Sequence, residues 1–245
     1  RKITFLCTAF DIEAVDFLEK LDVAAYKVAS HSLTNIPLLR YLTNIGKPVI
    51  MSTGMAQWDE VDSAVEIFKK KNSPLALLHC VSSYPQAADE SNLLMINKLR
   101  ERYNLPIGYS GHELGYLPTS VAVAVGADMV ERHITLDKNL NGFDHKLSLE
   151  PADFFNMIRD IRSIEKTIGV DEKSVSDREL VTRKKYHVSL VAAEDIQLGQ
   201  KITEAMLTLK NPGTGIPYNQ IDKVIGKKTK ELIKADTLIE VDMIE

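Results

Sequence analysis

The feature that most constrains this chain is a regular alternation of short apolar runs and amphipathic segments of helical period. The predicted strands are the apolar runs 3–7, 26–29, 48–51, 75–80, 106–109 and 129–134. The predicted helices are 11–20, 36–45, 57–71, 91–103, 117–125 and 151–168. Six consecutive strand–helix units of this kind predict an α/β fold, in which a parallel sheet has its helices outside.

Such a sheet is either open and doubly wound or closed as a (β/α)8 barrel. No strand is followed by GxGxxG or GxxxxGK, so nucleotide-binding open sheets lack their usual evidence. Polar residues instead follow the end of every predicted strand, where the loops of a barrel share one mouth. They are Thr8, Lys27, Ser30, 52–54, 82–84, Ser110, His112, Arg132 and His133. We therefore predict a TIM-type barrel.

Residues 1–169 supply six of the eight units of such a barrel. The chain opens at Arg1 without an initiator Met, and we expect the first two units to lie upstream. A charged, aperiodic segment at 170–186 is interpreted as a linker. Short β-like runs with turn signals then return, and they predict a small β-rich domain at 187–245.

Composition excludes several classes of protein. The net charge is −4, which gives no basic surface for nucleic acid or anionic lipid. No apolar run is long enough to span a membrane. The two cysteines, Cys7 and Cys80, lie in apolar runs without CxxC spacing, which favours a reducing cytoplasm over a disulfide-stapled, secreted fold.

His112 and His133 follow consecutive predicted strands, so their imidazoles are expected to lie side by side. Two neutral imidazoles with water or substrate oxygens suit Mn²⁺, Zn²⁺ or Fe²⁺ in an open site. The alternative is that one or both are structural histidines, because two ligands without a nearby carboxylate are a thin signature.

Lys27 lies within the predicted strand YKVAS. It is either a clamp for phosphate or carboxylate, a Schiff-base nucleophile, or a lysine that reaches out beside the helices. Its apolar neighbours Val28 and Ala29 disfavour the last. The hydroxyl residues at the strand ends, although each alone is commonly a helix cap, together predict a pocket for a phosphorylated or carboxylated substrate. They are Thr8, Ser30, Ser52, Thr53, Ser82, Ser83 and Ser110.

Asp144 follows the last predicted barrel strand on a glycine-containing loop. It is either a ligand for sugar hydroxyls, a base, or a solvated loop residue. His79, inside LALLHC, is interpreted as a core histidine, and His31 and His187 carry no clear signal.

Several motifs, taken in order, resemble the sialic acid synthase (N-acetylneuraminate synthase) family, which includes legionaminic and pseudaminic acid synthases. They are YKVAS, VIMSTGM, LLHCVSSYP, GYSGHELG, GADMVERHITLDK and FDHKLSLEP. The tail motifs DIQLGQKIT, KNPGTGIP and VIGKK resemble the antifreeze-like domain of that family. The resemblance covers essentially the whole chain.

The resemblance implies an enzyme that condenses phosphoenolpyruvate with an N-acylated hexosamine to give a sialic-acid-like nonulosonic acid and phosphate. It implies that His112 and His133 hold a divalent metal, usually Mn²⁺, and that the enzyme is a homodimer. The residues implied to bind phosphoenolpyruvate are Thr8, Lys27, Ser30, Ser52, Ser82 and Ser110. Tyr84 and Asp144 correspond to residues that touch the sugar.

Two departures from the family pattern concern the sugar. Ser32 stands where many bacterial members have glutamate, and Asn211 stands where they have an arginine that reaches into the partner's barrel. These departures count against N-acetylmannosamine itself and leave the phosphoenolpyruvate half intact, so the expected hexosamine is N-acetylmannosamine or a relative with other acyl substituents. The absent first two units supply a further lysine and glutamate in the family, so this chain alone is expected to be inactive.

Two other functions remain as alternatives. The first is a Schiff-base aldolase that acts through Lys27. The second is a non-catalytic saccharide-binding protein, which only the antifreeze-like tail suggests.

Overall fold

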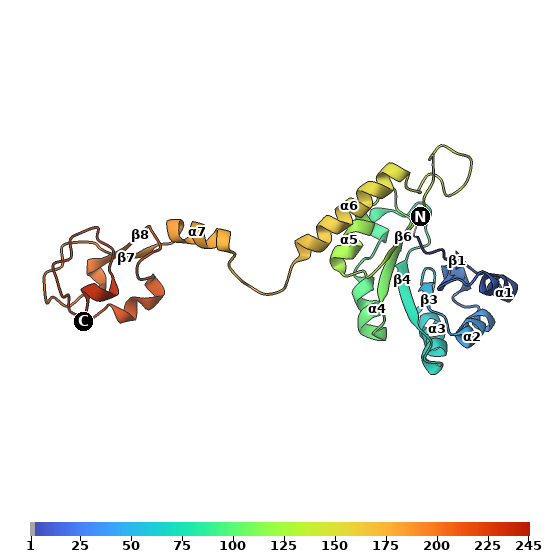
Figure 1. Cartoon of the computed structure of the whole chain (residues 1–245), viewed down its shortest axis with the longest axis horizontal. Coiled ribbons are helices and arrows are strands. Elements are labelled where there is room, and N and C mark those ends of the chain that lie inside the picture. The colour runs from blue at the N-terminus through green and yellow to red at the C-terminus, as the bar shows by residue number, and fades with distance from the viewer. Residues whose placement is uncertain (1–2) are drawn as a thin grey trace. The chain divides into compact units, whose positions relative to one another are not determined.

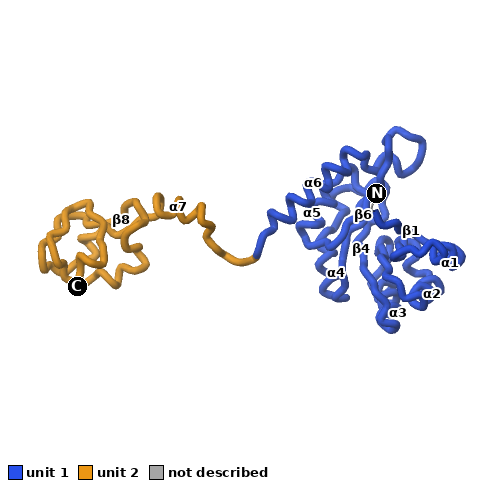
Figure 2. Tube along the Cα trace, viewed as in Figure 1, with its two compact units in different colours: residues 1–170 blue, residues 171–245 orange. Residues whose placement is uncertain are grey.

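The computed structural model describes residues 3–245, and the chain divides into two compact units, residues 1–170 and 171–245 (Figure 2). Unit 1 carries the strand–helix alternation, and unit 2 carries the β-rich tail.

Unit 1 is built on a six-stranded parallel sheet. The strands are β1 (Cys7–Thr8), β2 (Tyr26–Val28), β3 (Val49–Ser52), β4 (Leu75–Cys80), β5 (Ile107–Gly111) and β6 (Val130–Arg132). Their order in the sheet follows their order in the chain, whereas a doubly wound sheet reverses direction at a switch point. Right-handed crossovers in one direction place every helix on one face. The sheet is therefore a half-barrel, as expected for six of the eight units of a TIM-type barrel.

The helices of unit 1 stand around the outside of this sheet (Figure 1). They are α1 (Ile12–Lys20), α2 (Ile36–Ile45), α3 (Trp58–Lys70), α4 (Met95–Tyr103), α5 (Leu117–Val125) and α6 (Pro151–Ile168), with 3₁₀ turns η1 (Ser30–Ser32) and η2 (Ala88–Glu90). The ends follow from local chemistry. The Asp11 side chain accepts a hydrogen bond from the Ala14 amide at 2.7 Å, and Gly46 ends α2 with φ of 81°.

Two predicted elements begin four residues later in the structure. The strand predicted at 3–7 is reduced to Cys7–Thr8, because β1 pairs only with β2 among the described residues and Ile3 and Phe5 stay exposed. The helix predicted from Ser91 begins at Met95. Ser91 is instead buried, and its hydroxyl accepts a hydrogen bond from Gln86 Nε2 at 2.7 Å.

The core of unit 1 lies between the sheet and the helices. Tyr26, Met51 and Leu77 of the strands are completely buried there. They belong to one cluster with Leu39 of α2 and Phe68 of α3. This packing holds the strand ends in fixed positions relative to one another.

Unit 2 is a small domain with a two-stranded antiparallel sheet. It contains α7 (Asp177–Tyr186), β7 (Ser189–Ala192) and β8 (Leu207–Lys210), with 3₁₀ turns η3 (Glu204–Met206), η4 (Tyr218–Lys223) and η5 (Val241–Met243). Its core consists of Leu190, Ala192, Ile196, Ile202, Ile216, Val224, Ile233, Ile239 and Ile244.

The segment 170–186, predicted as an aperiodic linker, is a helix from residue 177 onward. A capping box explains this: the Ser176 hydroxyl accepts from the Glu179 amide, and the Glu179 carboxylate accepts from the Ser176 amide. The signal Ser-x-x-Glu was present in the sequence. The helix lacks an apolar stripe and buries no side chain, so periodicity does not reveal it.

Among residues 3–245 no helix is both long and apolar enough to cross a membrane.

Candidate active site

A cavity of about 410 Å³ opens at the carboxyl ends of the six strands. Each strand contributes a residue to its lining: Thr8, Lys27, Ser52, Cys80, Ser110 and Glu131. The loops beyond the strands add Phe10, Ser30, His31, Met55, Ser82, Tyr84, His112 and His133. The predicted convergence of polar residues at one mouth is therefore present.

Lys27 directs its ammonium group into this cavity. Its Nζ donates to Ser52 Oγ at 2.8 Å and to the Val28 carbonyl at 3.1 Å, and lies 3.7 Å from Glu131 Oε1. Burial lowers the pKa of Lys27, and the Glu131 carboxylate offsets part of that effect. The side chain does not reach out beside the helices.

Glu131 is a cavity residue that sequence reasoning missed. It accepts a hydrogen bond from Ser110 Oγ at 2.8 Å, besides its contact with Lys27. Successive residues of a strand face opposite sides, so Glu131 and His133 share the cavity side while Arg132 does not. The period of two was the available signal. The expectation that Arg132 lies at the mouth is wrong, because its side chain is fully buried against Glu113.

Five of the seven predicted hydroxyl residues line the cavity, namely Thr8, Ser30, Ser52, Ser82 and Ser110. Thr53 and Ser83 are not among the lining residues, and Thr53 Oγ1 instead donates to the Leu78 carbonyl at 3.0 Å. Ser30 Oγ accepts a hydrogen bond from the Gly54 amide at 3.0 Å. A Cβ at Gly54 would lie 2.4 Å from Ser82 Oγ and 2.8 Å from Ser30 Oγ. Glycine at this position therefore leaves the space that the two hydroxyls occupy.

His112 and His133 lie side by side, with ring centroids 5.3 Å apart. The Tyr84 ring packs against both, at 4.2 Å from His112 and 6.2 Å from His133. His112 Nδ1 lies 2.8 Å from the Val81 carbonyl oxygen, which can only accept, so Nδ1 carries the hydrogen. In the neutral ring the lone pair is then on Nε2, the arrangement that a metal-binding histidine needs.

Asp144 lies next to this pair, with Oδ2 at 3.6 Å from His133 Nδ1. Burial lowers the pKa of His133, and the Asp144 charge opposes that shift. For His112, burial acts in the same direction but is outweighed by the contacts with Cys80 Sγ and the Val81 carbonyl, which raise its pKa.

The donor set fits a divalent metal with an open coordination sphere. No group of three or more His, Cys, Asp or Glu side chains within residues 3–245 is arranged to hold an ion. Two imidazoles are ligands that suit such an ion, and any further positions would then have to be filled by water or substrate oxygens.

The two predicted sugar-specificity residues belong to different units of the chain. Ser32 is buried at the end of η1, 3% exposed. Asn211 belongs to unit 2, where its Nδ2 donates to the carbonyl groups of Tyr186 at 2.7 Å and His187 at 3.3 Å. Its amide is thus engaged at the end of α7.

The other histidines have distinct positions. His79 is buried, and its Nε2 lies 2.8 Å from the Ser91 carbonyl, which agrees with its interpretation as a core residue. His31 stacks on Phe10 with ring centroids 5.0 Å apart, and both line the cavity. No sequence signal had singled out His31 or Phe10. His187 follows α7 in unit 2.

Comparisons with known proteins agree with this architecture. Residues 1–173 match the NeuB family, and residues 187–245 match the SAF domain. The chain is 38% identical over 240 residues to the N,N'-diacetyllegionaminic acid synthase of Campylobacter jejuni, covering 97% of this chain and 72% of the relative. It is 36% identical over 245 residues to the N-acetylneuraminate-9-phosphate synthase of Mus musculus, covering 99% of this chain and 68% of the relative.

Among solved structures, the N-acetylneuraminic acid synthetase of Leptospira borgpetersenii, in complex with citrate, has a TM-score of 0.70 at 39% identity. That match covers 74% of this chain and 63% of the other. The chain thus spans about two thirds of the length of these proteins.

Proposed function

Since the chain belongs to the NeuB family, we propose that it forms a nonulosonic acid by condensing phosphoenolpyruvate with an N-acylated hexosamine. The observation that carries this proposal is the convergence in one cavity of a lysine, several hydroxyls and a histidine pair. The names of the relatives support it, because they are legionaminic acid, N-acetylneuraminate-9-phosphate and pseudaminic acid synthases. The sugar is N-acetylmannosamine or a relative of it.

In the proposed reaction, the methylene carbon of phosphoenolpyruvate attacks the aldehyde carbon and forms the new carbon–carbon bond. Water adds to the resulting cationic carbon, and breakage of that carbon's bond to the phosphate oxygen yields the 2-keto acid and inorganic phosphate. Phosphoenolpyruvate carries about three negative charges, so its binding site needs a cation and convergent hydrogen-bond donors. Lys27 and the hydroxyls of Thr8, Ser30, Ser52, Ser82 and Ser110 are proposed for this role.

His112 and His133 are proposed to hold a divalent ion, Mn²⁺ in particular. When bound, such an ion supplies a Lewis acid for the aldehyde oxygen. Tyr84 packs on both imidazoles and Asp144 lies beside His133, so these two side chains are proposed to contact the sugar.

The cellular setting is also part of the proposal. We place the enzyme in the cytoplasm as a homodimer. The two cysteines are unpaired, which is consistent with a reducing compartment. Sedimentation of the purified protein tests the oligomeric state.

A phosphate-release assay tests the reaction. It uses the longest natural form of the polypeptide that carries this chain, together with the chain alone, which we propose to be inactive. Phosphoenolpyruvate is supplied with N-acetylmannosamine or its 2,4-diacetamido and 6-deoxy relatives, in Mn²⁺ or EDTA. We expect release that needs both sugar and metal. Release that survives EDTA would contradict the metal assignment.

The histidine assignment has its own test. His112→Ala and His133→Ala should each remove Mn²⁺ binding, measured by the electron paramagnetic resonance signal of the free ion, and should lower turnover by at least about 100-fold, as loss of the Lewis acid predicts. His187→Ala is the matched control, because this residue belongs to unit 2, and it should change neither quantity. Full turnover in His112→Ala or His133→Ala would contradict the assignment of these residues as metal ligands.

A second candidate is a Schiff-base aldolase that acts through Lys27. One observation favours it: burial lowers the pKa of this lysine, which favours the neutral, nucleophilic amine. Borohydride trapping distinguishes the two reactions. A substrate adduct on Lys27, with activity retained in EDTA, would support the aldolase, and phosphate release without an adduct would support the synthase.

A further inference from the structure

A buried ion pair connects the residues that neighbour the two histidines in the chain. Arg132 Nη1 donates to Glu113 Oε1 at 2.7 Å, and the two side chains are 0% and 3% exposed. Glu113 immediately follows His112 in the chain, and Arg132 immediately precedes His133. The pair therefore joins the two backbone segments that carry the histidines.

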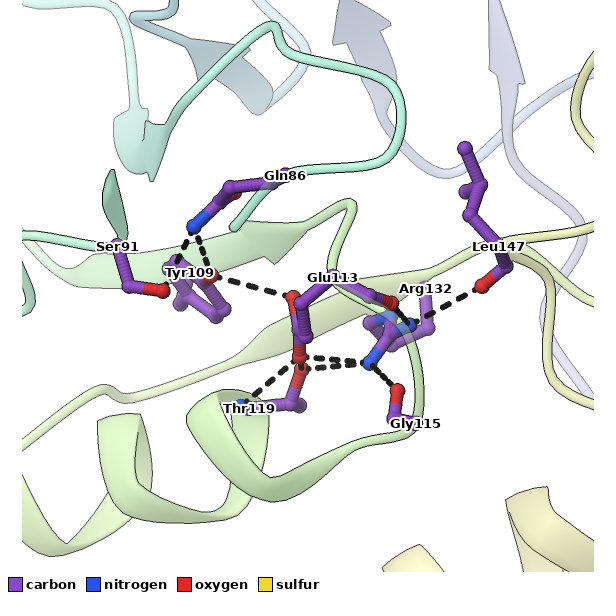
Figure 3. A network of polar contacts seen from close by, with 8 residues as sticks. All are labelled: Gln86, Ser91, Tyr109, Glu113, Gly115, Thr119, Arg132 and Leu147. Carbon is purple, nitrogen blue, oxygen red and sulfur yellow. Dashed lines mark hydrogen bonds and ion pairs between the residues drawn. The ribbon is translucent and has the colours of Figure 1, made fainter. Parts of the chain in front are cut away.

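The arginine also binds the backbone of the surrounding loops (Figure 3). Its Nη2 donates to the carbonyl groups of Glu113 at 2.8 Å and Leu147 at 3.3 Å, and its Nη1 donates to the Gly115 carbonyl at 2.7 Å. The Thr119 hydroxyl and amide donate to Glu113 Oε1 at 2.5 and 3.1 Å. One guanidinium thus links β6, the loop after β5, and the loop before α6.

The Glu113–Arg132 ion pair lies at the point where hydrogen bonding between β5 and β6 ends. The last paired residues of β5 and β6 are Gly111 and Arg132, so neither His112 nor His133 is held by the β5–β6 ladder. Beyond it, the Gln86 amide donates to the His112 carbonyl at 3.0 Å, and the Leu149 amide donates to the His133 carbonyl at 2.9 Å. The ion pair is the direct side-chain connection between the two diverging segments.

Stability is a weak explanation for such a pair. The free-energy cost of desolvating two charges is about as large as the gain from their attraction. Apolar residues of the same volume commonly stabilise a core equally well or better. Arg132 Nε is also buried without a partner among the described residues. A geometric role accounts for the arrangement, because the planar guanidinium fixes several directions at once.

We propose that Glu113 and Arg132 are positioning residues that set the spacing of His112 and His133, and thereby the affinity of this site for a divalent ion. The proposed effect on ion affinity rests on the proposed function. The proposed effect on the spacing of the two rings does not depend on it.

The test compares the full chain with the double variant Glu113→Gln/Arg132→Met. A double replacement is used because either single change leaves an unpaired buried charge, whereas Gln keeps an acceptor for Thr119. The matched control is Asp62→Asn/Arg102→Met, which removes the exposed ion pair between α3 and α4, 2.5 Å long in the structure. Thermal unfolding first establishes that each protein is folded.

Two readouts follow. In crystals grown without metal, the double variant should show the two imidazole rings displaced from their 5.3 Å separation by about 1 Å, the scale at which a site fails for want of support. Titration with Mn²⁺ alone should show affinity lowered about 10- to 100-fold, the usual effect of losing residues that orient metal ligands. Affinity for phosphoenolpyruvate and all properties of the control should stay within about twofold of wild type.

Unchanged ring spacing together with unchanged Mn²⁺ affinity in the folded double variant would overturn the proposal. If that variant does not fold, Arg132→Lys decides: a lysine keeps the charge but has no fork to reach several elements, so unchanged Mn²⁺ affinity would again overturn it. If the wild-type chain binds no Mn²⁺, the proposed function loses its metal, while the ring spacing still decides whether the pair positions the histidines.

Discussion

Lys27, Ser110 and Glu131 show how single residues set the charge of the cavity. The Lys27 ammonium and the Ser110 hydroxyl, two donors aimed at the cavity, both contact the Glu131 carboxylate. An anionic substrate must therefore compete with Glu131 for these donors. Under the proposed function, recognition of such a substrate would depend on additional donors, and we propose the Ser30 and Ser82 hydroxyls beside Gly54 for this role.

Gly54→Ala tests the importance of those hydroxyls. The added Cβ would overlap Ser82 Oγ and Ser30 Oγ without straining the backbone, because Gly54 does not lie in the left-handed region. We expect the dissociation constant for phosphoenolpyruvate, measured by calorimetry, to rise about tenfold or more, since one hydrogen bond to a charged group contributes about 1.5–3 kcal/mol.

The control for Gly54→Ala is Gly215→Ala in unit 2. It is the same chemical change, and its tightest contact is 3.1 Å to Ser189 Cβ, which requires that neighbour to move by only a few tenths of an ångström. It should leave phosphoenolpyruvate binding unaltered. Equal affinities in wild type and Gly54→Ala would remove the hydroxyl pair from the binding site.

At the scale of elements, β5 and β6 and the residues that directly follow them turn alternate side chains to opposite sides. Ser110 and His112 face the cavity, and so do Glu131 and His133. Glu113 and Arg132 face the opposite side and form the buried network. The period of two thus separates the groups proposed to bind substrate or metal from the groups proposed to orient them.

Close packing around Gly108 of β5 leads to a prediction about stability. A Cβ at Gly108 would lie 2.4 Å from Met129 Cγ, 2.5 Å from Leu78 Cδ2 and 2.5 Å from the Met129 carbonyl oxygen. Gly108→Ala should therefore lower the free energy of unfolding by about 1–3 kcal/mol through overpacking. Urea unfolding followed by the fluorescence of Trp58, the chain's single tryptophan, measures this in unit 1.

Adding Met129→Ala should restore part of the stability lost in Gly108→Ala. It removes the clash with Met129 Cγ but leaves Leu78 Cδ2 and the Met129 carbonyl oxygen in place, so recovery should be incomplete. A loss below about 0.5 kcal/mol in Gly108→Ala alone, the range of neutral surface changes, would refute the packing argument.

At the scale of the whole molecule, the two units have separate hydrophobic cores. The clusters of unit 1 and unit 2 share no residue. The fragment 171–245 is therefore expected to fold by itself. Its thermal unfolding, followed by circular dichroism, should be cooperative, and the amides of β7 should exchange as slowly as in the full chain.

The shorter fragment 187–245 is the control for the role of α7. This helix buries no side chain, so its removal should leave the core of unit 2 intact. A non-cooperative transition in 171–245 would show that unit 2 needs the rest of the chain.

What the sequence determined by itself was local and periodic. Helix 36–45 with its Gly46 stop, helix 151–168 with its initial proline, and strand 75–80 were predicted with the bounds that they have. Helix capping, φ preferences and hydrophobic period act over a few residues. They can therefore be recognised in the sequence without knowledge of tertiary contacts. The cavity positions of Lys27, His112 and His133 followed from strand ends in the same way.

Tertiary structure decided the orientation of the side chains beyond the strand ends and the partners that they contact. The shortening of the strand predicted at 3–7 depended on pairing, and a strand exists only where a neighbour bonds to it. The roles of Glu131 and Arg132 depended on facing, and their partners Ser110 and Glu113 lie about twenty residues away in sequence. Long-range contacts of this kind leave no local pattern, because their energy arises only when distant segments meet.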